Sequence, residues 1–65
     1  MTKQEAINEY IAIYYGDVYN LKRELEQGDK IKARCGLLDY FDSLAKEGRI
    51  TEKQRNTWTA PNSWY

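Results

Sequence analysis

The chain has 65 residues, with ten basic and ten acidic side chains, one cysteine, one proline and no histidine. A chain of this length forms one domain and buries only about 60% of its surface on folding. A single thiol without histidine provides too few ligands for a structural zinc site, and it makes no internal disulfide. Stability therefore has to come from helix packing or from contact with another protein.

Charge and hydropathy exclude further classes of protein. The net charge is zero, whereas a general nucleic-acid binder needs a basic surplus and a DNA mimic an acidic one. No apolar run approaches the length of a membrane-spanning segment. Residues Met1–Glu5 lack the pattern of a signal peptide. A lone thiol without an export signal indicates a reducing, cytoplasmic environment.

The first part of the chain carries a helical pattern. Thr2 and Glu5 form a capping-box pattern at its start. Apolar residues then recur at alternating spacings of four and three, which forms a seam typical of a helix lying along a partner. The seam consists of Ile7, Ile11, Tyr14, Val18, Leu21 and Leu25. Because it keeps its phase through Gly16, we expect one helix over about residues 2–27, continuous or kinked there. The alternative is a break at Gly16, with Asp17 as the N-cap of a second helix.

Another helix is predicted over about residues 29–47. Gly28 can take the left-handed conformation that ends the preceding helix, and Asp29 can cap the next one. At about 100° per residue, the apolar side chains of this helix cover an arc of about 220°. They are Ile31, Ala33, Cys35, Leu37, Leu38, Tyr40, Phe41, Leu44 and Ala45. One neighbouring helix needs a stripe of only about 100°. We therefore expect a central helix with a neighbour on each side.

A short helix over about residues 51–58 is predicted by a second capping box, formed by Thr51 and Gln54. Pro61 disfavours regular helix in the tail, residues 59–65. The tail nevertheless carries Trp64 and Tyr65. Two large aromatic side chains favour a segment that folds back on the domain.

These elements predict a single all-α domain. The long first helix packs antiparallel on the central helix as a helical hairpin, and the short C-terminal helix with the aromatic tail closes the other side. The predicted core comes from the apolar faces of the two long helices. It consists of Ile7, Ile11, Tyr14, Val18, Leu21, Leu25, Ile31, Cys35, Leu38, Phe41, Leu44 and Ala45.

Neither catalysis nor metal binding is favoured by the residue types present. Histidine, the usual base near neutral pH, is absent. Cys35 falls on the apolar arc and is expected to be a small core residue. The carboxylate pairs Asp39/Asp42 and Glu5/Glu9 are more typical of a solvated face than of a cation site. We therefore expect no enzyme, no cofactor and no bound metal.

Basic side chains gather around the turn between the two long helices, although the whole chain is neutral. They are Lys22, Arg23, Lys30, Lys32 and Arg34. Such a basic corner can contact phosphates, which makes local nucleic-acid binding one hypothesis. Glu24, Glu26 and Asp29 are interleaved with it, and alternating charges are more typical of a solvated, salt-bridged face.

Aromatic residues are unusually frequent, with six tyrosines, two tryptophans and one phenylalanine. If the first helix is continuous, Tyr15 and Tyr19 lie together outside the buried stripe. Tyrosine and tryptophan dominate the contacts that carry protein–protein binding energy, so we predict a partner-binding surface. Its residues are Tyr15, Tyr19, Lys22, Arg23 and either Trp58 or Trp64. The alternative is that the tail packs over the two tyrosines.

The opening Met1–Ile7 and the segment Glu47–Trp58 resemble the ends of short all-helical accessory proteins of bacteriophages and prophages. The resemblance is confined to these two segments and transfers no functional residue. It implies a small protein that binds a host protein, such as a nuclease, an immune effector or RNA polymerase, and inhibits or redirects it.

The sequence as a whole predicts a cytoplasmic protein-binding module that covers a surface of its partner without chemistry of its own. A homodimer through the apolar seam of the first helix is a second hypothesis. Nucleic-acid binding at the basic corner is a third.

Overall fold

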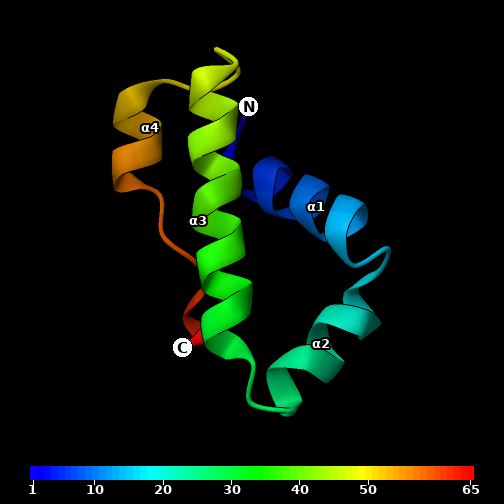
Figure 1. The fold of residues 1–65 in the computed structure, drawn as a ribbon. Coiled ribbons are helices and arrows are strands. Elements are labelled where there is room, and N and C mark those ends of the chain that lie inside the picture. The colour runs from blue at the N-terminus through cyan, green and yellow to red at the C-terminus, as the bar shows by residue number, and fades with distance from the viewer.

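The computed structural model describes all 65 residues and contains helices but no strand. Four α-helices follow one another: α1 (Lys3–Tyr14), α2 (Val18–Glu26), α3 (Lys30–Lys46) and α4 (Glu52–Thr57). A short 3₁₀-helix, η1 (Asn62–Trp64), lies in the tail. α1 and α2 lie on one side of α3, and α4 lies on the other (Figure 1). The predicted all-α class with a short C-terminal helix is confirmed.

The first predicted helix is divided into α1 and α2. Gly16 has a φ of 82°, in the left-handed region that favours glycine, and it separates the two helices. The Asp17 carboxylate then accepts a hydrogen bond from the Asn20 amide at 3.0 Å and caps α2. The continuous helix expected over residues 2–27 is therefore wrong, and the alternative break at Gly16 is observed. The spacing of the apolar residues did not reveal the break. Both α1 and α2 pack against α3, so apolar residues are needed on both sides of Gly16.

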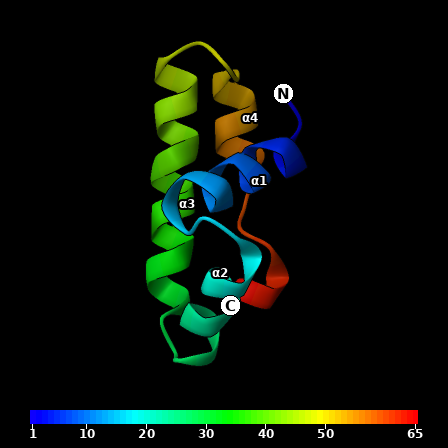
Figure 2. The same ribbon diagram turned by 90° about the vertical axis from the view of Figure 1, so that its right-hand side faces the viewer.

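α1 runs across α3, whereas α2 leads through a tight turn into α3 and forms a hairpin with it (Figure 2). At the crossing, Tyr10 Oη donates a hydrogen bond to the Ala33 carbonyl at 3.3 Å. A β-carbon at Gly36 would overlap the Tyr10 hydroxyl and lie 3.3 Å from its Cζ. Glycine in mid-helix is less stable than alanine by about 1 kcal/mol. At this position its lack of a side chain lets the Tyr10 ring lie against the α3 backbone.

α4 begins with the second predicted capping box. Thr51 Oγ1 accepts a hydrogen bond from the Gln54 amide at 3.1 Å, and Gln54 Oε1 accepts one from the Thr51 amide at 2.9 Å. The corresponding box of Thr2 and Glu5 starts α1. Both starts follow from local sequence because these side chains satisfy amides that have no partner within the first helical turn.

The tail returns along α3 and ends near its first turns (Figures 1 and 2). Two side chains from that part of α3 hold its main chain. Lys30 Nζ donates to the carbonyl oxygen of Tyr65 at 3.1 Å, and Arg34 Nη1 donates to that of Trp64 at 2.8 Å. The tail therefore folds back, as predicted, and Trp64 is buried.

One core holds the domain together, and five of its residues come from a single face of α3. The buried side chains are Ala6, Ile7, Tyr10, Leu21, Ala33, Leu37, Tyr40, Phe41, Leu44, Ile50, Ala60 and Trp64. Four predicted core residues are among them, namely Ile7, Leu21, Phe41 and Leu44. Ile11, Leu25 and Ala45 are partly buried against it.

Five predicted core residues are instead exposed: Tyr14, Val18, Ile31, Cys35 and Leu38. Tyr14 and Val18 flank the Gly16 turn, which lies beyond the edge of α3 (Figure 1). The other three lie on the side of α3 opposite the buried face, where neither neighbour covers them. The prediction failed there because two neighbours cover less of the apolar arc than its width suggested.

Candidate functional site

Large side chains remain exposed on both sides of the Gly16 turn. We call this set the corner surface; it consists of Ile13, Tyr14, Val18 and Tyr19, whose exposed fractions run from 46% to 72%. Ile13 and Tyr14 end α1, and Val18 and Tyr19 begin α2. The turn between them is fixed by a hydrogen bond of 2.7 Å that Asn20 Nδ2 donates to the Tyr15 carbonyl. The corner surface therefore stands on a defined turn.

A basic edge adjoins Tyr19 on α2. Lys22 and Arg23 follow Tyr19 at the i+3 and i+4 positions, so the three side chains share one face of the helix. All three are exposed, and neither Lys22 nor Arg23 forms an ion pair within the chain. Three of the predicted partner-binding residues are therefore close together and accessible.

Tyr15 is separated from this group by the break and turns inward. It lines a cleft of about 440 Å³ between α1, α2 and α3, together with the rings of Tyr10, Tyr14 and Tyr40. Burial, together with the nearby Glu24 carboxylate and Tyr10 hydroxyl, raises the pKa of Tyr15 above its ordinary value. Tyr15 therefore supports the base of the corner surface, while Tyr14 at the cleft rim is accessible.

The two tryptophans lie away from the corner surface. Trp64 is only 4% exposed, and its ring centroid lies 6.3 Å from that of Tyr10. Trp58 is partly buried and packs edge-on against Phe41 at 5.3 Å. Both tryptophans pack within the chain, so neither adds to the exposed surface around Tyr19. The tail thus packs on Tyr10, and Tyr19 stays uncovered.

The basic corner is divided by contacts within the chain. Lys30 and Arg34 bind the main chain of the tail, and the Arg34 guanidinium also lies over the Tyr65 ring at 4.6 Å. Lys32 pairs with Glu24 at 3.3 Å. Only Lys22 and Arg23 remain without a partner, which leaves little of the phosphate-binding surface that the nucleic-acid hypothesis requires.

A charged cluster joins α1 to the turn after α3. The Arg49 guanidinium binds Glu9 through two hydrogen bonds of 2.6 and 2.8 Å, and the Tyr40 hydroxyl donates to the same carboxylate. The Arg49 and Tyr40 hydrogen bonds lower the pKa of Glu9 to about 2. Burial and the Glu9 carboxylate raise the pKa of Tyr40 to about 12. All partners are satisfied within the chain, so this cluster acts as a structural clasp.

A second accessible apolar area, the α3 strip, lies on the outer side of α3 and consists of Ile31, Cys35 and Leu38. Sequence reasoning placed these residues in the core, as it did Tyr14 and Val18. The signal that could have identified the strip was the width of the apolar arc. The signal for the corner surface was the adjacent pair Gly16 and Asp17, which stops one helix and starts another.

The seam proposed for homodimerisation does not exist as one surface. Its members are shared between α1 and α2, and Ile7 and Leu21 are buried inside the chain. The seam cannot pair with a second copy while those residues fill the core.

Comparisons with protein-family models, with curated proteins and with solved structures found no match for this chain. None of its helices combines the length and apolarity that crossing a membrane requires. The candidate site therefore rests on the geometry of the corner surface and its basic edge.

Proposed function

We propose that this chain is a small protein-binding module that covers a surface of its partner and thereby inhibits or redirects it. The observation that carries the proposal is the corner surface, where Tyr14 and Tyr19 are 63% and 72% exposed beside unpaired Lys22 and Arg23. Tyrosine and arginine are both enriched among the residues that dominate the binding energy of protein interfaces.

The physical basis of the proposal is the low cost of ordering these side chains. A tyrosine ring has few rotatable bonds and buries a large area, so little conformational entropy is lost when it is immobilised. The backbone beneath it is already fixed by the Asp17 cap and the Asn20 hydrogen bond. Lys22 and Arg23 would orient an acidic partner surface during approach.

The proposed partner is a host protein, and the proposed site of action is the cytoplasm. The first part rests on the resemblance of Met1–Ile7 and Glu47–Trp58 to phage accessory proteins. The second rests on the exposed thiol of Cys35, which reducing conditions would keep free. Binding alone would account for the effect on the partner, without catalysis by this chain.

The test compares proteins captured from a host lysate by wild type and by the double variant Tyr14→Ala/Tyr19→Ala. Asn56→Ala, an exposed change on α4, is the matched control. We expect a captured protein that the double variant loses and the control retains, with equal helix content by circular dichroism. A captured protein retained equally by all three folded chains would contradict the assignment of the corner surface.

A further inference from the structure

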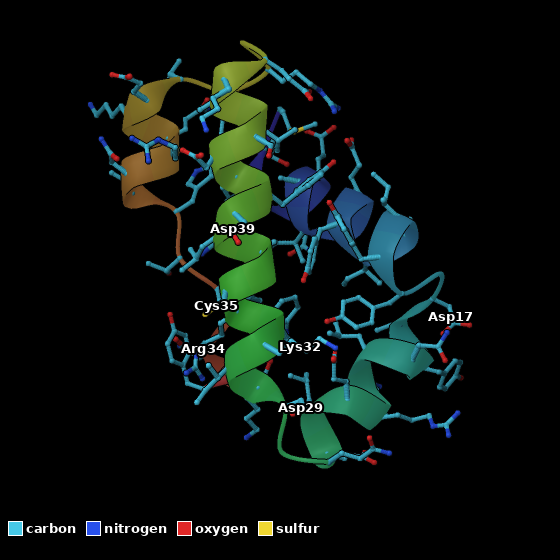
Figure 3. All side chains as sticks on the ribbon, in the orientation of Figure 1. Asp17, Asp29, Lys32, Arg34, Cys35 and Asp39 are labelled. Atoms are coloured by element: carbon cyan, nitrogen blue, oxygen red, sulfur yellow. The ribbon has the colours of Figure 1, made fainter.

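The α3 strip is an apolar surface without a neighbour in the chain. Ile31 and Leu38 are 65% and 45% exposed, and Cys35 between them is exposed as well. Spacings of four and three place these residues on one side of the helix. In Figure 3, Cys35 points away from α2, whereas Lys32 points towards it. Arg34 adjoins Ile31 and Leu38, and the Tyr65 ring stacked on it borders the strip.

We propose that the α3 strip packs against the same strip of a second copy, with the two α3 helices antiparallel. The 4–3 spacing is that of helices that interdigitate along a shared seam. The next seam position is Asp42, which pairs with Lys46 at 3.1 Å and with Arg55 at 3.3 Å. This ionic group ends the apolar strip and limits its length.

Charges beside the strip select the antiparallel orientation. Lys32 and Asp39 are seven residues apart and therefore lie along the same edge. Parallel helices would bring Asp39 against Arg34 of the second copy, which already binds the tail, and would leave Lys32 facing no acidic side chain. Antiparallel helices bring Lys32 against Asp39 of the second copy, and the twofold axis repeats the contact. Asp39 forms no ion pair within the chain, and the Lys32 side chain is 76% exposed.

The same orientation fixes the contacts inside the strip. With Lys32 beside Asp39 of the second copy, Cys35 of each copy faces Leu38 of the other. Every contact occurs twice because the interface is isologous, so one substitution changes it at two places. The strip is short, which places the interface at the small end of the known range. Self-association should therefore be reversible and depend on concentration.

Sedimentation equilibrium and the alkylation rate of Cys35, each measured across a concentration series, test the proposal. We expect the wild type to shift from monomer to dimer as concentration rises, and Cys35 alkylation to slow in parallel. Leu38→Asp should abolish dimerisation because it places two carboxylates in the apolar contact. Ile13→Asp, the same kind of change at an exposed apolar residue of the corner surface, should leave dimerisation unchanged.

Asp39→Lys tests the orientation without touching the strip itself. Lys32 of each copy would then face the new lysine at position 39 of the other, which makes two repulsive pairs. The dissociation constant of the dimer should rise about tenfold, and high salt should partly reverse this rise. Three results would each overturn the proposal: a monomer at every concentration up to the millimolar range, a dimer that Leu38→Asp leaves intact, or one that Asp39→Lys leaves unchanged. None of these measurements involves the partner of the corner surface, so this proposal and the proposed function fail separately.

Discussion

The two faces of α3 have similar residue types and opposite surroundings. The inner face carries Leu37, Phe41 and Leu44, each at most 1% exposed. The outer face carries Ile31 and Leu38, which are about half exposed or more. The width of an apolar arc on a helix therefore does not show how much of that arc the chain itself covers.

The largest expected difference between the faces is at two neighbouring leucines. Leu37→Ala leaves a cavity in the fully buried face and should lower the free energy of unfolding by about 2–5 kcal/mol, enough to unfold much of so small a domain. Leu38→Ala, one residue further on, should change it by only about 0.5 kcal/mol. Urea unfolding followed by circular dichroism measures both. If both variants lost the same free energy of unfolding, the outer face of α3 would also be covered within the monomer.

Gly36 provides the next largest effect, because it lies on the edge where α1 crosses. Gly36→Ala gains about 1 kcal/mol of helix propensity, but the new methyl group overlaps the Tyr10 hydroxyl, so we expect a net loss of about 1–3 kcal/mol. Tyr10→Phe removes the overlapping oxygen. Gly36→Ala should therefore lower the free energy of unfolding less in the Tyr10→Phe background than in the wild type. If the losses from the two changes simply added, the Tyr10 hydroxyl would not lie against Gly36.

A smaller effect is expected where the tail joins α3. Arg34→Ala removes the hydrogen bond to the Trp64 carbonyl and the stacking on Tyr65. We expect a loss of about 1 kcal/mol in unfolding free energy and faster hydrogen exchange in residues 62–65. Lys22→Ala, an exposed change without a partner, is the control. Unchanged exchange in the tail would show that Trp64 alone holds it.

The smallest effect is expected at the clasp between α1 and Arg49, which is partly exposed to solvent. The pKa of Glu9 in the folded chain is about 2, below the ordinary value of 4.5. Its stabilising contribution is therefore complete at neutral pH and is lost as pH falls from about 4.5 to about 2. Glu9→Gln should flatten this part of the stability profile relative to wild type, leaving the contribution of Glu5, whose pKa is also lowered. An unchanged profile would contradict the clasp.

The starts of α1 and α4 were predictable because capping is local, whereas the Asp29 side chain, which was expected to cap α3, makes no capping hydrogen bond. Thr2 with Glu5 and Thr51 with Gln54 satisfy amides within four residues of sequence, whatever the rest of the chain does. The return of the tail was predictable from its two large aromatics. These features require only short-range chemistry or the general cost of exposing large rings.

The corner surface was not predictable as such because it depends on a choice between two local signals. Apolar phase favoured a continuous helix through Gly16, and the Gly–Asp pair favoured a break. Only packing decides between them, since α1 crosses α3 at Gly36 and α2 then turns back towards the start of α3. Tyr19 was correctly expected outside the core, whereas Tyr15 is partly buried in the cleft as a result of the same break.

The burial of Trp64 has a consequence for the order in which this core is completed. The inner face of α3 stays incompletely covered until residues 60–65 dock, because Ala60 and Trp64 belong to the same buried cluster. A chain in which this segment is undocked therefore presents an unfinished apolar groove to chaperones and proteases.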